Sequence, residues 1–77
     1  MKVHKIVNLI AFENTYLLEN DRHVIVVDPG SDWRKIQRKL EEIAKPITAI
    51  LLTHTHYDHI MSLDKVRDNF ANPPVYV

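Results

Sequence analysis

Cysteine is absent from this sequence, and glycine occurs only once, at position 30. The lack of cysteine excludes disulfide bonds and thiolate metal ligands. A single glycine excludes the glycine-rich loops that bind phosphate in nucleotide-binding proteins. Net charge is also absent, because 10 basic and 10 acidic side chains cancel within the 77 residues. We therefore expect no basic surface for nucleic acid or for an anionic membrane.

Long apolar runs are missing as well, since no window approaches the roughly 20 apolar residues of a membrane span. The apolar run from Ile6 to Phe12 follows two lysines, as it does in a signal peptide. However, Asn8 interrupts this run, Glu13 ends it, and no small-residue cleavage site follows. We expect a mature cytoplasmic start and no membrane partner.

The alternation of strand-like and helical patterns predicts an α/β fold with two helices. The apolar runs predict strands at residues 3–13, 15–19, 23–27 and 47–53, and a further one beginning at 75. The apolar stripes at helical spacing predict helices at residues 31–44 and 59–69. Ser31 is the expected N-cap of the first helix, and Asn20-Asp21 the expected two-residue turn.

A strand, a helix and a strand follow one another from Val24 to Thr53. A connection of this length predicts parallel strands and a right-handed crossover. Ligand sites in such sheets form beyond the carboxyl ends of the strands. The end of this unit is therefore the place to look for functional side chains.

Four potential metal ligands follow its last strand within six residues: His54, His56, Asp58 and His59. Imidazole and carboxylate suit Zn²⁺, and iron or manganese also fit this set. If the strand geometry persists, the first two histidines point to the same side and can hold one ion together. Asp58 and His59 can face another direction, so that the segment serves two adjacent ions. The alternative is that these histidines lie on an exposed turn without a function.

Asp28 ends the strand at 23–27, and His54 follows the strand at 47–53. If these two strands are neighbours, Asp28 comes close to the four candidate ligands. It could then accept a hydrogen bond from a ligand histidine or from the backbone of that segment, and so fix its orientation. Equally, Asp28 could do no more than shape the turn before the helix.

The pattern His54-x-His56-x-Asp58-His59 resembles the signature of the metallo-β-lactamase-fold hydrolases. The resemblance implies that the first two histidines bind one metal and that Asp58 and His59 bind the second. It also implies that Asp58 orients the nucleophilic water, and that the intact site holds two zinc ions. Asp28-x-Gly30 matches a family segment of similar role, which favours the supporting role of Asp28.

The family fold is an αββα sandwich that is much longer than this chain, and the resemblance covers only its front portion. We therefore interpret residues 1–77 as the N-terminal fragment of one metallo-β-lactamase-like domain, with a mixed sheet and two helices. The further histidine, bridging aspartate and last histidine that complete the family's sites have no counterpart here. We expect the chain alone to be inactive, and to self-associate or to belong to a longer chain.

For the full-length protein, the resemblance implies a metal-dependent hydrolase. In such an enzyme a metal-bound hydroxide attacks an ester, thioester, lactone or amide of a small-molecule substrate. One alternative is a non-catalytic, truncated metal-binding or assembly module. Another is a nuclease of the same fold, against which the neutral charge counts. Met61 follows the motif closely, where the family commonly has small residues. For this reason the resemblance implies no particular substrate.

Overall fold

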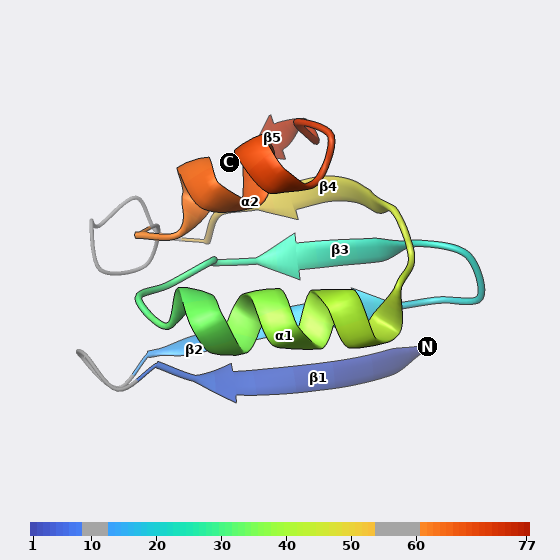
Figure 1. Cartoon of the computed structure of the whole chain (residues 1–77), viewed down its shortest axis with the longest axis horizontal. Helices are drawn as coiled ribbons and strands as arrows, with labels where there is room; N and C mark the ends of the chain where they lie inside the picture. Colours follow the sequence, from blue (N-terminus) through green and yellow to red (C-terminus); the bar gives the residue numbers. More distant parts are fainter. Residues whose placement is uncertain (9–12, 54–60) are drawn as a thin grey trace.

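The computed structural model describes residues 1–8, 13–53 and 61–77, which form one five-stranded sheet and two helices (Figure 1). The strands are β1 (Lys2–Val7), β2 (Asn14–Glu19), β3 (Val24–Val27), β4 (Ile47–Leu51) and β5 (Val75–Tyr76). The helices are α1 (Trp33–Ile43) and α2 (Leu63–Asn69). Neither of these helices is long and apolar enough to cross a membrane.

The strands lie side by side in the order of the sequence, β1-β2-β3-β4-β5. β2 is antiparallel to both β1 and β3, whereas β4 is parallel to both β3 and β5. The predicted mixed sheet is therefore confirmed, and so is the parallel pairing across the first helix. Val27 lies opposite Leu51 in the register, so β3 and β4 end together at one edge of the sheet.

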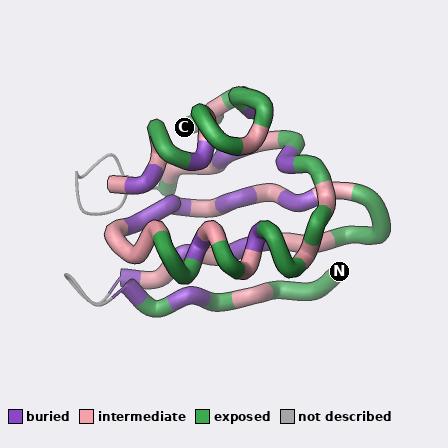
Figure 2. Tube along the Cα trace, in the orientation of Figure 1, coloured by how far each residue is buried: buried purple, intermediate pink, exposed green. Residues whose placement is uncertain are grey.

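Both helices cover the same face of the sheet. Ile36 and Leu40 of α1 and Val66 of α2 are buried in one apolar cluster with the strands. The rings of Trp33 and Phe70 meet edge to face, with their centroids 6.4 Å apart. Along β3, buried residues alternate with half-buried ones, as expected for a strand with one face toward this core (Figure 2).

The predicted first strand was too long. β1 ends at Val7 and runs antiparallel to β2, so no single strand extends through residue 13. The predicted N-cap was also wrong by one residue. Asp32 caps α1, because its carboxylate accepts a hydrogen bond from the Lys35 backbone N–H at 3.4 Å. Ala44 ends α1 in the left-handed conformation, with φ of 57°.

The turn between β2 and β3 lies one residue later than predicted. The Asn20 backbone N–H donates to the His23 carbonyl at 3.0 Å, which leaves Asp21 and Arg22 as the two loop residues. The prediction overlooked the Asn20 side chain, whose oxygen accepts hydrogen bonds from the backbone N–H groups of both Arg22 and His23.

The second helix also begins later than predicted, at Leu63, and residues 59 and 60 lie outside the described ranges.

Candidate metal centre

The structure describes both flanks of the segment that carries the predicted metal ligands, residues 54–60, here called the motif segment. His54, His56, Asp58 and His59 themselves lie outside the described residues. Within residues 1–8, 13–53 and 61–77, no three His, Asp or Glu side chains gather to hold a metal ion. The predicted ligand set therefore stays a prediction, and the described flanks define its setting.

Asp28 holds the first flank. It follows β3 in the left-handed conformation, with φ of 53°, which aspartate tolerates better than most residues do. Its backbone N–H donates to the Leu51 carbonyl at 2.9 Å. Its carboxylate accepts two hydrogen bonds from Thr53, one from the backbone N–H at 2.8 Å and one from the hydroxyl group. The residue just before His54 is thereby tied to the end of the neighbouring strand.

Ser62 holds the second flank. Its backbone N–H donates to the Pro29 carbonyl at 3.0 Å, and its hydroxyl group donates to the Gly30 carbonyl. Ser62 is the N-cap of α2, but its side chain makes no capping hydrogen bond with this helix. The hydroxyl group instead connects α2 to the turn after β3. Both flanks of the motif segment are thus bonded to residues 28–30.

Thr15 of β2 forms hydrogen bonds with the turn at residues 28–30. Its hydroxyl group is fully buried and donates to the Asp28 carbonyl at 2.7 Å. The same oxygen accepts hydrogen bonds from the Gly30 N–H at 3.0 Å and from the Asn8 side chain at 2.9 Å. One hydroxyl group on β2 therefore fixes both ends of the turn that carries the motif flanks.

Asn8 extends the network to the start of α1. Its side-chain oxygen accepts from the Asp32 backbone N–H at 2.8 Å, and its side-chain nitrogen donates to Thr15 and to the Glu13 carbonyl. Gly30 packs so closely here that a Cβ atom would lie 2.6 Å from the Asn8 nitrogen and 2.1 Å from a Glu13 carboxylate oxygen. A larger residue at position 30 would therefore have to displace the side chains of Asn8 and Glu13.

Sequence reasoning missed three of these residues: Asn8, Thr15 and Ser62. The best available signal was Asn8, a polar residue inside an apolar run, because a buried polar group needs several partners. Asn8, Thr15, Asp28 and Ser62 are all buried. The buried polar groups of this network therefore lie at the turn to which Thr53 and Ser62 are bonded.

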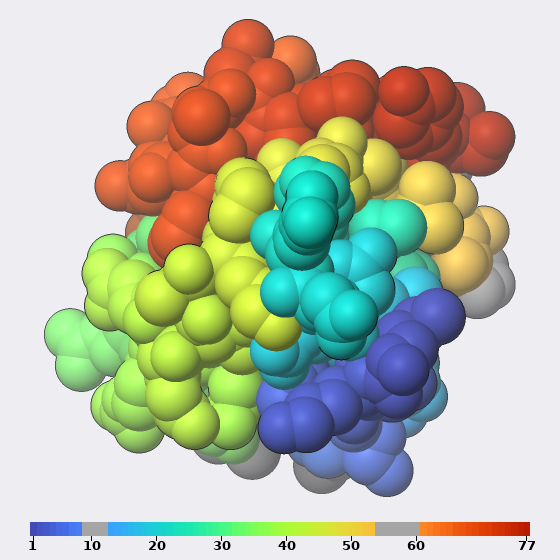
Figure 3. Space-filling model, turned by 90° about the vertical axis from the view of Figure 1, so that its right-hand side faces the viewer, coloured from blue at the N-terminus to red at the C-terminus, as the bar shows by residue number. Residues whose placement is uncertain are grey.

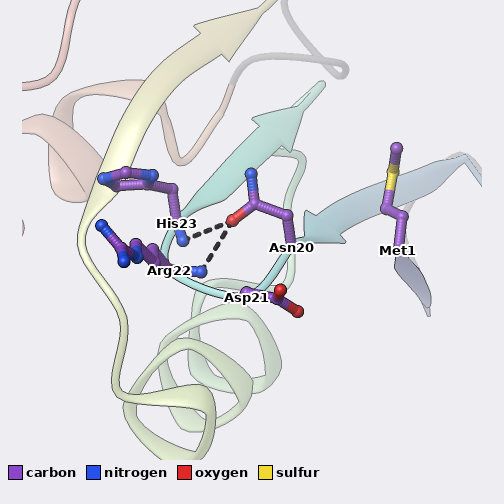
Figure 4. Close-up of a pocket in the computed structure, with 5 residues that line it drawn as sticks. All are labelled: Met1, Asn20, Asp21, Arg22 and His23. Atoms are coloured by element: carbon purple, nitrogen blue, oxygen red, sulfur yellow. Dashed lines mark hydrogen bonds between the residues drawn. The ribbon is translucent and has the colours of Figure 1, made fainter.

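A hollow of about 440 Å³ lies at the other end of the sheet, lined by Met1 and residues 20–23 (Figure 4). The Asn20 side chain turns toward the backbone nitrogens of Arg22 and His23 there. His23 precedes β3, whereas Asp28 and Thr53 follow the strands' carboxyl ends. This hollow is therefore separate from Asp28 and Thr53.

The N-terminal strand and the turn after β2 lie together at that end of the sheet (Figure 3). His4 of β1 contacts Glu19, the last residue of β2. Its Nε2 atom lies 2.8 Å from Glu19 Oε1, and Lys45 Nζ lies 2.6 Å from Glu19 Oε2. The hydrogen bonds from Lys45 and from His4 lower the pKa of Glu19 from 4.5 to about 2. His4 thus bonds to a carboxylate at the end of β2 that lies away from Thr15.

The comparison with known families gives a match over most of the chain. The family model described as "Metallo-beta-lactamase superfamily" matches residues 11–77. The chain belongs to the metallo-β-lactamase superfamily. A metal cofactor is typical of this superfamily, as its name and those of its members indicate.

Individual relatives support the same assignment. A "Probable metallo-hydrolase" of Streptococcus pyogenes serotype M6 is 61% identical over 77 residues, which are 100% of this chain and 33% of that protein. The "Probable polyketide biosynthesis zinc-dependent hydrolase PksB" of Bacillus subtilis is 39% identical over 64 residues, covering 80% of this chain and 28% of that protein.

A solved structure confirms the predicted fold. The B3 metallo-beta-lactamase BLEG-1 matches with a TM-score of 0.89 at 38% sequence identity, covering 99% of this chain and 36% of that chain. This chain therefore has part of the metallo-β-lactamase fold. It spans about a third of the length of the streptococcal relative.

Proposed function

We propose that this chain is the N-terminal part of a metal-dependent hydrolase and that the motif segment supplies four of its metal ligands. The observation that carries the proposal is the anchoring of both flanks to one turn, Thr53 to Asp28 and Ser62 to Pro29 and Gly30. A metal site needs ligands held in place by such hydrogen bonds. Membership of the superfamily supports the same reading.

The donor set fits zinc. We assign His54 and His56 to one ion, and Asp58 and His59 to a second, with iron or manganese as other ions that suit these donors. The zinc dependence in the name of the Bacillus relative supports zinc. When bound, the metal supplies Lewis-acid activation of water. Within this chain, Asp58 orients the attacking water, and Asp28 holds the start of the motif segment.

The proposed substrate is a small molecule with an ester, thioester, lactone or amide bond. Two ligands for each ion are fewer than the three protein ligands of a typical catalytic zinc site. The remaining ligands would come from the other two thirds of the family fold, which this chain does not span. The chain on its own is accordingly proposed to be inactive.

Hydrolysis by the full-length protein tests this function. Purified enzyme would be assayed on one ester, one thioester, one lactone and one amide, with zinc and after removal of zinc by a chelator. We expect zinc-dependent turnover of at least one class, its loss in the His54→Ala/His56→Ala variant, and its retention in His23→Ala. Turnover that survives both the chelator and the double substitution would refute the proposal.

A second candidate function is an assembly role for the isolated chain. It is favoured by the edge of the sheet that β5 forms. β5 pairs with β4 alone among the described strands, and Tyr76 is 56% exposed. An apolar strand at an open edge promotes pairing with another chain. We propose that the 77-residue chain self-associates, which light scattering would detect. A stable monomer that hydrolyses esters with added zinc would contradict this candidate and the proposed inactivity.

A further inference from the structure

Ser62 stands at the start of a helix, but its hydroxyl group is used elsewhere. A serine at the N-cap normally accepts a hydrogen bond from the first turn of its own helix. Here the side chain makes no capping bond with α2 and donates to the Gly30 carbonyl instead. The Ser62 backbone N–H donates to the Pro29 carbonyl at 3.0 Å. Because Ser62 is only 1% exposed, both contacts are enclosed by this chain alone.

The motif segment is tied at each flank to a different group of the same turn. Thr53 is bonded to the Asp28 carboxylate. Ser62 is bonded to the Gly30 carbonyl. The Thr15 hydroxyl group holds the turn between these two groups, because it donates to the Asp28 carbonyl and accepts from the Gly30 N–H. Either flank can therefore lose its bond while the turn and the other flank stay in place.

The two flanks also differ in which candidate ligands they are close to along the chain. In the proposed function, the first ion is held by two histidines that follow Thr53 by one and three positions. The second ion is held by Asp58 and His59, which precede Ser62 by four and three positions. Each intervening residue adds two rotatable backbone dihedral angles, so a ligand is positioned mainly by the nearer flank. Each flank accordingly serves one ion.

We propose that Ser62 is a positioning residue for the second ion, a role that rests on the proposed function of the motif segment. Its hydroxyl group fixes the flank from which Asp58 and His59 are presented. Asp28 has the corresponding role for the first ion, through Thr53. The two flank bonds thus set the two zinc affinities separately, and one affinity can change without the other.

A purely structural role for Ser62 has a different consequence. Losing a buried hydrogen bond lowers the free energy of unfolding, whatever the function of the residue. Such a loss would leave both zinc affinities unchanged or lower both alike, because unfolding abolishes both sites together. The ratio of the two zinc dissociation constants therefore distinguishes positioning from stability.

Zinc titration of the full-length protein against a competing chromophoric chelator measures the two dissociation constants. The His54→Ala/His56→Ala variant identifies the step that belongs to the second ion. We expect Ser62→Ala to weaken the second ion by about 10–100-fold and to leave the first unchanged. Asp28→Asn should show the reverse, with the first ion weakened and the second retained.

Ser31→Ala is the matched control, since this second serine directly follows the same turn. Its hydroxyl oxygen is buried and has no hydrogen-bond partner among the described residues, so its removal should leave both constants unchanged. Ser62→Thr keeps the donor and should keep the parent ratio, which tests the proposal even if Ser62→Ala does not fold.

Three results would overturn the role of Ser62. These are a changed ratio in Ser62→Thr, equal effects of Ser62→Ala on the two constants, and a parent protein that binds a single zinc ion. Zinc-dependent turnover by the parent protein is measured separately. Turnover that persists alongside any of these results would leave the proposed hydrolase in place while removing Ser62 from its metal site.

Discussion

Two hydrogen bonds join Asp28 to Thr53, although the two residues lie 25 positions apart in the sequence. One carboxylate oxygen accepts from the Thr53 backbone N–H and the other from its hydroxyl group. Since Thr53 immediately precedes His54, this contact determines where the motif segment leaves the sheet. The role of Asp28 toward a metal is therefore open to a direct test.

Asp28→Asn is expected to weaken metal binding without unfolding the protein. Asparagine also tolerates the left-handed backbone at this position, but it keeps only one acceptor oxygen for Thr53. Removing a hydrogen-bond partner of this kind typically costs 10–100-fold in metal affinity. Competition with a chromophoric chelator would measure the affinity in the full-length protein, with Asp21→Asn in the exposed turn as the control. If both variants bind metal as the parent does, Asp28 only forms the turn.

Thr15→Val should destabilise the fold. The substitution keeps the shape of the side chain, but it leaves the Asp28 carbonyl without its donor and the Gly30 N–H without its acceptor. Leaving a buried polar group unpaired costs about 1–3 kcal/mol. Urea unfolding would measure the free energy of unfolding. Thr48→Val is the control, since that hydroxyl group is exposed and its hydrogen bond is long, at 3.5 Å. Equal losses in the two variants would contradict the importance of the network.

Glu19→Gln should change the pH dependence of stability. The carboxylate bonds Lys45 and His4, and the pKa of Glu19 falls from 4.5 to about 2. A lowered pKa means that the ionised group stabilises the fold above pH 4.5, and that this contribution is lost as the pH falls toward 2. The difference in unfolding free energy between parent and variant should thus shrink over this interval. A difference that stays constant from pH 7 to pH 2 would show that the charge of Glu19 contributes nothing.

The sequence predicted the framework well, because its signals are local. The apolar run Val24–Val27 and the stripe through Ile36 and Leu40 each bury one face, and both elements formed as expected. The N-cap of the first helix was missed by one residue, because Ser31 and Asp32 are both good caps and the tertiary contact of Asp32 with Asn8 cannot be read from local sequence.

The candidate site was predictable only in part. Parallel pairing of β3 and β4 was enough to bring Asp28 close to the segment after β4, because the pairing fixes where both strands end. The connections made by Asn8 and Ser62 could not be predicted, since their partners lie 24 and 32 positions away. Hydrogen bonds of that range depend on the packed structure rather than on local pattern.

Metal content tests the central claim most directly. The full-length protein, its His54→Ala/His56→Ala variant and the control His23→Ala would be purified alike, and the zinc bound to each would be measured by mass spectrometry. We predict bound zinc in the parent and in the control, and clearly less zinc in the double variant. Equal zinc in all three proteins would contradict the assignment of the motif segment as the metal centre.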